Sequence, residues 1–321
     1  MKKRRRKRRL IIVIFVLLII LGFLLFIYFS NKQKLKEYEN QLTKISLKIK
    51  NNNTYASCLI TPYKSDKVDQ LYDDLLNSLN TSLVSIYFED IYNDYTLTLN
   101  ENTIYYNASI IKLFDASYII DNKIDLNDTI TFNNTYRSLA KEGLLDYALN
   151  EEVPIKDVLY YAISVSDNGA HRMLTDYIGI SNLKEYAKKT LGITLRITDT
   201  ERYGSLSVND TNILLKHLYS LLQNNDEYSN LLKDAMNNDY CNFLSFDDIE
   251  ILHKYGYYSS YLHDIGIYNN NNPYLISLFT LYGNPEKGGS DKINNLSKEI
   301  YNIYKTNLDE KEEYCYNLAY N

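Results

Sequence analysis

An uncharged apolar run near the amino terminus is the strongest constraint on how this chain can be arranged. It extends from Leu10 to Phe29 and directly follows the basic residues Lys2–Arg9. In a helix its 20 residues would span roughly 30 Å, the thickness of a bilayer's hydrocarbon core. A cleavable signal peptide has a shorter apolar segment and small residues after it, whereas "IYFSNKQKLK" follows here. We therefore expect an uncleaved membrane anchor.

The basic cluster predicts the orientation of that anchor. Lys and Arg residues mark the cytoplasmic end of a spanning helix, so residues 1–9 should be cytoplasmic and residues 10–29 should form the single span. The rest of the chain should then lie outside the membrane. A cleaved signal peptide is the alternative, and it would export the same part. Residues 30–63 should form a stalk or linker, in which "KNNNTYAS" is typical of a flexible joint.

Composition excludes several classes of partner. The chain has a formal net charge of −5, and without its eight basic residues at positions 2–9 the remainder carries −13, which argues against binding nucleic acid. The three cysteines, Cys58, Cys241 and Cys315, are too few for a disulfide framework, although one unspecified pair could bridge outside the cell. The four histidines lack metal-binding spacing, so we expect neither a metal nor a cofactor.

The exported part has strand patterns at both ends and helical patterns between them. "SLVSIYFEDI" and "DYTLTLN" predict a hairpin, and residues 109 to 232 are predominantly helical. Strand character returns between residues 248 and 283, and a closing helix follows. We predict an α+β domain over residues 64–306, in which an antiparallel sheet assembled from both chain ends is flanked by helices and receives an inserted helical subdomain. Residues 307–321 would form a tail.

One lysine lies in a segment that is otherwise mainly apolar. In "YNASIIKLFDA" Lys112 lies inside an apolar helical pattern, three residues after Ser109. Burial of a lone ammonium group is costly and usually shifts its pKa. A lysine that extends to solvent along a polar stripe would be the ordinary explanation. The other explanation is that the lysine serves the serine, because residues three apart share one helix face.

Two further motifs favour the second explanation. Ser166-Asp167-Asn168 lies between two helical patterns, and Lys254-Tyr255-Gly256 lies at the start of the late strands. With Ser109-Ile110-Ile111-Lys112, this set resembles the S-x-x-K, S-D-N and K-T-G motifs of serine β-lactamases and penicillin-binding proteins, with the class A β-lactamase-like branch as the closest match. S-x-x-K recurs at Ser138 and Ser181, but only Ser109 has the required order of elements around it.

The resemblance implies a role for each matched residue. Ser109 would be the nucleophile, with Lys112 as its base, and Ser166 would relay the proton to the leaving nitrogen. Asn168 would hold the substrate's amide side chain, and Lys254 would attract a substrate carboxylate. Tyr255, Gly256 and Tyr257 would bind substrate, and the backbone N–H groups of Ser109 and Tyr257 would form the oxyanion hole. A capping pair at a helix start would be the structural alternative for Ser166 and Asn168.

The chain departs from the family pattern in two places. Tyr255 replaces a small threonine or serine, which makes carboxylate recognition doubtful. The class A enzymes carry an E-x-x-L-N glutamate that activates the deacylating water, but here the corresponding stretch offers only Glu201 in E-R-Y-G, which we interpret as an unrelated surface residue. Acylation should therefore be intact while deacylation is slow.

The predicted function is a membrane-anchored serine hydrolase that acts on β-lactams or D-Ala-type cell-wall peptides through a Ser109 acyl-enzyme. The alternative is a non-hydrolytic or slowly deacylating β-lactam-binding, sensing or scaffold protein. A Ser-His-Asp hydrolase is a distant third hypothesis, because the adjacent residues His263 and Asp264 would point to opposite faces of a strand.

Overall fold

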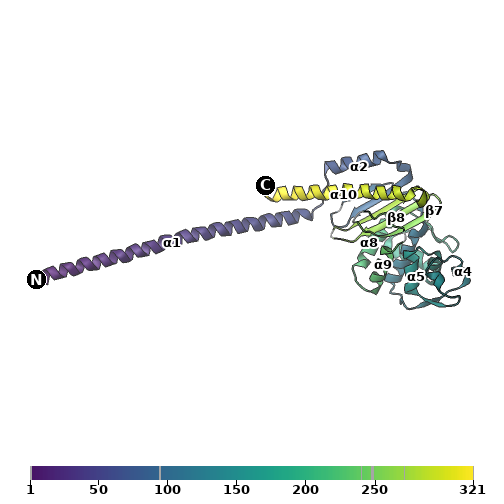
Figure 1. Cartoon of the computed structure of the whole chain (residues 1–321), viewed down its shortest axis with the longest axis horizontal. Helices are drawn as coiled ribbons and strands as arrows, with labels where there is room; N and C mark the ends of the chain where they lie inside the picture. Colours follow the sequence, from purple (N-terminus) through teal and green to yellow (C-terminus); the bar gives the residue numbers. More distant parts are fainter. Residues whose placement is uncertain (1, 94, 240, 247–248, 271, 321) are drawn as a thin grey trace. The chain divides into compact units, whose positions relative to one another are not determined.

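The computed structural model describes residues 2–93, 95–239, 241–246, 249–270 and 272–320 (Figure 1). The chain forms two compact units, each described here by itself. One comprises the residues up to Thr61 together with those from Glu312 onward, and the other comprises Pro62–Lys311. The predicted site residues all belong to the second unit.

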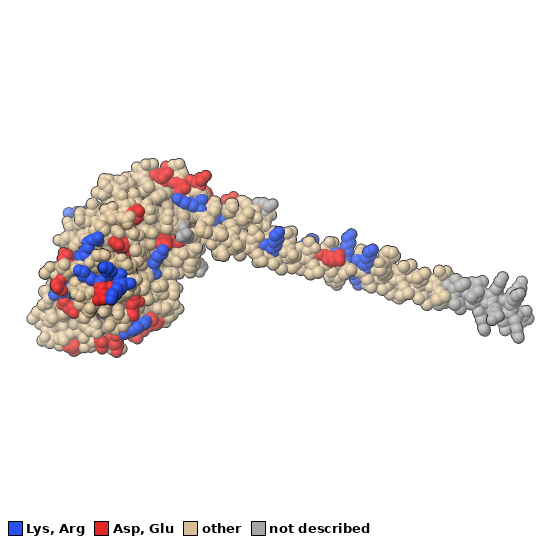
Figure 2. Space-filling model, turned by 180° about the vertical axis from the view of Figure 1, so that it is seen from behind, with Lys and Arg blue, Asp and Glu red and all other residues tan. Residues whose placement is uncertain are grey.

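The first unit contains the long helix α1 (Lys2–Leu59). Within the described residues, α1 is the one helix that is long and apolar enough to cross a membrane by length and composition. Between Leu17 and Ser30 it carries no Lys, Arg, Asp or Glu, which Figure 2 shows as an uninterrupted tan stretch. These side chains are exposed to their surroundings, as a bilayer-spanning segment requires.

The predicted flexible joint at "KNNNTYAS" is wrong, since α1 continues through this segment to Leu59. Contacts with the end of α10 (Gly289–Tyr320) account for the difference. Cys58 and Cys315 form a disulfide, and the Tyr55 hydroxyl donates a hydrogen bond to Glu312. These tertiary contacts outweigh the weak helix propensity of the asparagines. Residues 307–320, expected to form a tail, are likewise part of α10.

The second unit is organised around an antiparallel sheet of five strands in the order β2-β1-β9-β8-β7. The strands are β1 (Val84–Asp90), β2 (Thr96–Leu99), β7 (Leu252–Tyr258), β8 (Tyr261–Tyr268) and β9 (Tyr274–Thr280). The central pairing of β1 with β9 joins the two ends of the domain, with Ile86 opposite Leu278. The predicted hairpin is confirmed as β1 and β2, and the sheet assembled from both chain ends is confirmed with it.

Alternate side chains of the sheet belong to two hydrophobic cores. Ile86, Ile276 and Leu278 pack toward helix α2 (Asp66–Ser78) and residues 289–311 of α10, whereas Leu275 and Phe279 pack toward the helical insertion. Figure 1 shows α2 and α10 on one side of the sheet and α8 (Val208–Leu222) on the other. The period-two pattern of a strand that is buried on both faces produces this arrangement.

The helical insertion lies between β2 and β7, as predicted. Its remaining helices are α3 (Lys112–Asp121), α4 (Asn134–Arg137), α5 (Ile155–Ser164), α6 (Asn168–Ile178), α7 (Ile180–Tyr186) and α9 (Glu227–Asn237). Two short ribbons were not anticipated, and they pair β3 (Tyr105–Tyr106) with β6 (Ser205–Leu206) and β4 (Thr129–Thr131) with β5 (Glu152–Pro154). Pairs of two or three residues are too short to give a periodic signal.

The disulfide leads to a thiol count that can be measured. Alkylation of the denatured, unreduced chain should modify Cys241 alone, and reduction beforehand should expose all three cysteines. Loss of the bridge in Cys315→Ser should lower the free energy of unfolding by about 2–5 kcal/mol, because the unfolded chain gains conformational freedom. Urea denaturation with and without dithiothreitol measures this difference. Cys241→Ser is the matched control and should keep the full sensitivity to reduction.

Candidate active site

Ser109 and Lys112 lie where the chain turns from β3 into the helical insertion. Ser109 belongs to the 3₁₀ turn Ala108–Ile111, and α3 begins at Lys112. Ala108 adopts a left-handed conformation with φ of 48°, which is strained for a residue with a side chain. This strained turn carries the Ser109 side chain to the rim of a cavity, while the Lys112 side chain is fully buried behind it.

The Lys112 amine is surrounded by oxygen atoms from two separate segments. Its Nζ lies 3.0 Å from Ser109 Oγ and 3.2 Å from Ser166 Oγ. It also lies 2.7 Å from the Ser166 carbonyl oxygen and 2.9 Å from Asn168 Oδ1. The S-x-x-K and S-D-N motifs therefore meet at one nitrogen atom, although 54 residues separate Lys112 from Ser166.

The middle residue of S-D-N fixes the geometry of its neighbours. Asp167 caps α6 by accepting a hydrogen bond from the Ala170 N–H at 2.8 Å, and its other oxygen accepts from the backbone N–H of Lys141. Capping therefore falls to Asp167 rather than to Ser166 and Asn168, whose side chains are both directed at Lys112. Ser166 is held in a left-handed conformation with φ of 53°, a second strained residue at the site.

The surroundings of Lys112 favour its neutral form. Burial lowers the pKa of Lys112 well below its ordinary value, because the ammonium loses its hydration. The positive charges of Lys254 and Lys141 lower this pKa further. The carboxylates of Asp167 and Asp115 oppose the shift but do not reverse it.

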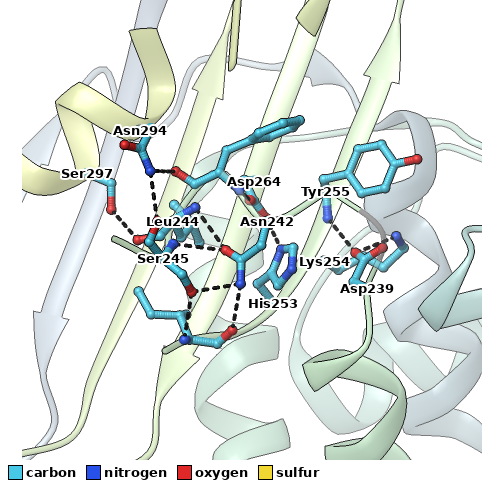
Figure 3. Close-up of polar contacts among 12 residues, drawn as sticks. Asp239, Asn242, Leu244, Ser245, His253, Lys254, Tyr255, Asp264, Asn294 and Ser297 are labelled. Carbon is cyan, nitrogen blue, oxygen red and sulfur yellow. Dashed lines mark hydrogen bonds and ion pairs between the residues drawn. The ribbon is translucent and has the colours of Figure 1, made fainter. Parts of the chain in front are cut away.

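Lys254 is buried and does not face the cavity. Its Nζ lies 2.9 Å from Asp239 Oδ2, and the backbone N–H of Tyr255 donates to the same oxygen at 3.2 Å. Figure 3 shows both groups converging on this one carboxylate. Burial lowers the pKa of Lys254 and raises that of Asp239, whereas their close contact favours the charged pair. The charge of Lys254 is thus balanced within the protein.

Tyr255 occupies the place of the small hydroxyl residue of the third motif. Its ring covers the Lys254 ammonium, with 4.4 Å between Nζ and the ring centroid. The side chains of Ser166 and Cys241 lie near its phenol and influence the pKa of that group. Burial raises the pKa of the phenol, which keeps it a neutral hydroxyl beside Ser166.

Gly256 is where β7 passes close to the turn that carries Ser109. A Cβ atom here would lie 2.8 Å from the Asn107 carbonyl oxygen and 3.2 Å from the Ser109 nitrogen, so only glycine permits the approach. β7 is the last strand of the sheet order, and the Tyr255 N–H points away from β8 to Asp239. Because N–H directions repeat every second residue, the Tyr257 N–H lies on the same open edge of β7.

The cavity in front of Ser109 has a volume of about 270 Å³. Five of the residues that line it were anticipated from the sequence and five were not. The first group is Ser109, Ser166, Asn168, Tyr255 and Tyr257, and the second is Tyr106, Ala108, Lys141, Tyr203 and Tyr258. None of these lining residues is an aspartate or a glutamate. The missed tyrosines carried no signal, because the chain contains 33 of them.

Glu201 lies in the loop beside the cavity but does not line it. Its Oε1 accepts hydrogen bonds from the backbone N–H groups of Tyr203 and Gly204 at 3.0 and 3.2 Å. The nearby negative charge of Glu201 raises the pKa of the Tyr106 phenol, after the larger effect of burial. The Glu201 carboxylate thus stabilises its own loop by accepting hydrogen bonds from the backbone of that loop.

The histidines do not form a serine triad with Ser109. His263 Nε2 bonds the Tyr106 carbonyl at 2.9 Å, and burial lowers the pKa of His263 to about 4. Asp264 instead bonds His253 Nδ1 at 2.9 Å, on the other face of β8. Within the described residues, no three His, Cys, Asp or Glu side chains come together as metal ligands.

Solved structures share this fold. A variant of PBP-A in an acyl-enzyme complex with penicillin G is 20% identical, with 76% of this chain and 99% of that chain covered and a TM-score of 0.63. The TLA-1 extended-spectrum β-lactamase is 17% identical, with 74% and 99% covered and a TM-score of 0.63. A class A β-lactamase from Bacteroides cellulosilyticus is 21% identical, with 75% and 98% covered and a TM-score of 0.61.

A search of curated proteins found no match. The model of one protein family does match, and it is described as the β-lactamase enzyme family. The match covers residues 67–304, most of the second unit and about three-quarters of the chain. The chain therefore belongs to the β-lactamase enzyme family, whose members are serine hydrolases.

Proposed function

We propose that this protein is a membrane-anchored, extracytoplasmic serine hydrolase that is acylated on Ser109 by β-lactams or D-Ala-type peptides, and that it releases the acyl group slowly. The observation that carries the proposal is the contact of the buried Lys112 amine with both Ser109 Oγ and Ser166 Oγ. The roles given below to individual residues are part of the proposal.

The hydrogen bonds around Lys112 support its role as a base. A neutral amine has two N–H donors and one lone pair. The Ser166 carbonyl and Asn168 Oδ1 can only accept hydrogen bonds, so they use both donors. The lone pair then remains for a hydroxyl hydrogen of Ser109 or Ser166. The site thus prepares Lys112 to receive a proton before any substrate arrives.

Acylation follows from this arrangement. Lys112 takes the proton of the Ser109 hydroxyl as Oγ forms a bond to the substrate carbonyl carbon. The N–H groups of Ser109 and Tyr257 stabilise the negative charge that develops on the carbonyl oxygen. When the C–N bond breaks, Ser166 donates its proton to the leaving nitrogen and receives one from Lys112. Lys112 returns to its neutral form, and the acyl group remains on Ser109.

Deacylation lacks an equivalent arrangement. Water must lose a proton as it attacks the ester, and none of the residues lining the cavity is a carboxylate. Glu201 is outside this lining and is engaged by the N–H groups of Tyr203 and Gly204. Lys112 is the remaining base, and its lone pair is directed at the two serines. We therefore expect the acyl-enzyme to accumulate.

The contact of Lys112 with both serines also favours a second candidate function, a β-lactam sensor or binding protein that is acylated without turnover. Both functions share the acylation step and differ only in the rate of acyl release. The lifetime of the acyl-enzyme therefore separates them.

Two features support a location outside the cytoplasm. α1 contains an apolar stretch of membrane-spanning length, and the Cys58–Cys315 disulfide is of a kind that persists in oxidising compartments. Residues 10–29 would be the anchor, with residues 1–9 in the cytoplasm. Trapping thiols in intact cells before lysis tests this placement. Reduced Cys58 and Cys315 would contradict it.

Acylation can be tested directly with the full-length protein in detergent. Incubation with penicillin G should produce an adduct on Ser109, observed by intact-mass spectrometry and peptide mapping, which outlasts the removal of free antibiotic. Ser109→Ala should abolish the adduct. Lys112→Met should slow adduct formation by about 10²–10⁴-fold, the usual contribution of a general base.

Ser181→Ala is the matched control for this test, because Ser181 begins a second S-x-x-K sequence away from the cavity. It should be acylated at the wild-type rate. Antibiotic consumed without a lasting adduct would indicate efficient deacylation and contradict the proposed slow release. An adduct that survives Ser109→Ala would disprove the mechanism.

The lowered pKa of Lys112 also predicts how stability depends on pH. Between that pKa and the ordinary value near 10.5, the unfolded chain binds a proton at Lys112 that the folded chain does not. Stability should therefore rise with pH in this window, with Lys112 contributing a slope of up to about 1.4 kcal/mol per pH unit. Urea denaturation of wild type and Lys112→Met at several pH values isolates this slope. Equal slopes in the two proteins would mean that Lys112 is charged in the folded state.

A further inference from the structure

Three lysines surround the cavity, but only one presents its ammonium group to it. Lys112 and Lys254 are fully buried. Lys141 is exposed and is the one cation among the residues that line the cavity. A negatively charged part of a substrate that reaches Ser109 therefore meets Lys141 first.

Lys254 is unavailable to a substrate carboxylate. Its ammonium is neutralised by Asp239 at 2.9 Å and covered by the ring of Tyr255 at 4.4 Å. The ring packs against that of Phe243, with 5.9 Å between the centroids, and Ser166 and Cys241 lie near its phenol. A carboxylate would have to displace this ring and compete with Asp239 for an ammonium group that is fully buried, which is costly.

Lys141 is held at the cavity by the S-D-N segment. Its backbone N–H donates to Asp167, so the loop that carries Lys141 is tied to the start of α6. Lys141 lines the same cavity as Ser109, and its charge lowers the pKa of both Lys112 and Lys254. Within the part of the chain that the structure describes, the Lys141 ammonium is in no salt bridge.

The acidic groups around the cavity favour binding of a substrate with its carboxylate directed toward Lys141. Asp167 is buried and accepts hydrogen bonds from the backbone N–H groups of Ala170 and Lys141, and among the described residues it forms no salt bridge with the Lys141 ammonium. Glu201 lies on the side of Tyr106 and Tyr203. The negative end of a substrate is thus repelled from the Glu201 side and attracted to the Lys141 side.

Tyrosine rings form much of the remaining wall. The ring of Tyr106 lies 5.1 Å from that of Tyr258 and 6.2 Å from that of Tyr203, measured between centroids. Tyr257 and Tyr258 are both exposed at the rim. Such a surface suits a flat or ring-bearing acyl group, which can stack on the aromatic faces.

We propose that Lys141, and not the lysine of the K-x-G motif, receives the substrate's carboxylate in this protein, and that the preferred acyl donor combines this carboxylate with a flat or ring-bearing group that packs on the tyrosines. The inference rests on the proposed acylation of Ser109. Lys141 and Tyr255 would then both determine substrate specificity. Lys141 attracts the carboxylate, and Tyr255 blocks the access of that carboxylate to Lys254.

A pair of reagents that differ only in the carboxylate tests the proposal. Acylation of full-length protein by penicillin G and by its methyl ester is followed by intact-mass spectrometry, and the ratio of the two rates is compared among variants. Wild type should favour the free acid by about 10-fold or more, a typical effect of one desolvated charge contact. Lys141→Met should bring the ratio of the free-acid rate to the ester rate close to one, and Lys141→Arg should largely retain the preference for the free acid.

Lys184→Met is the matched control, because Lys184 is an exposed lysine outside the cavity, and its ratio should equal that of wild type. Tyr255→Thr in the Lys141→Met background should restore the preference by opening the way to Lys254. A wild-type ratio near one, or a preference that survives Lys141→Met, would overturn the inference while leaving Ser109 acylation intact. Failure of both reagents to acylate wild type would instead overturn the proposed function and the inference with it.

Discussion

The desolvated amine of Lys112 is the interaction on which the rest of the site depends. A buried amino group is tolerated only where its donors are satisfied, and here the Ser166 carbonyl and Asn168 Oδ1 satisfy them. Those acceptors come from α6 and the residue before Asp167, so the turn that carries Ser109 and the S-D-N segment must keep their relative positions. The same contacts would both stabilise the fold and position Lys112 for its proposed role as a base.

Backbone strain on both sides of Lys112 is consistent with this account. Ala108 and Ser166 both adopt left-handed conformations, each at a cost of order 1–2 kcal/mol. Asp167 offsets part of the cost because it caps α6 and ties down the Lys141 loop at the same time. The open edge of β7 completes the site, and Gly256 lets that edge approach the Ser109 nitrogen. The site thus forms where the helical insertion meets the edge of the sheet.

The sequence predicted the parts of this arrangement that depend on local pattern. Hairpin periodicity located β1 and β2, and the order of the three motifs brought together Ser109, Lys112 and Ser166. The pairing of Cys58 with Cys315 was left open, because 257 residues separate them and no local pattern links them. The helix through "KNNNTYAS" was missed for a related reason, since distant contacts stabilise it.

The cavity wall was the least predictable part. Lys141 ends the S-x-x-K sequence that begins at Ser138, which does not have the order of elements expected around the nucleophile. Lys141 nevertheless lines the cavity, because its backbone N–H is bonded to Asp167. The burial of Lys254 beneath Tyr255 depends on Asp239, whose position relative to β7 only the fold determines. Motif spacing identifies the candidate catalytic residues, whereas only the fold shows that Asp239 and the loop of Lys141 lie beside them.

The two departures from the family pattern have a common consequence for the acyl-enzyme. Without a carboxylate in the cavity wall, an attacking water depends on Lys112, whose contacts already engage Ser109 and Ser166. Tyr255 adds a phenol against Ser166 and fills space that a smaller residue would leave to solvent. In the proposed mechanism the missing carboxylate leaves bond formation at Ser109 unimpeded and slows only the attack of water. If Ser109 is acylated as proposed, brief exposure to an acylating ligand would leave a long-lived modified state, which suits the detection of a ligand better than its rapid destruction.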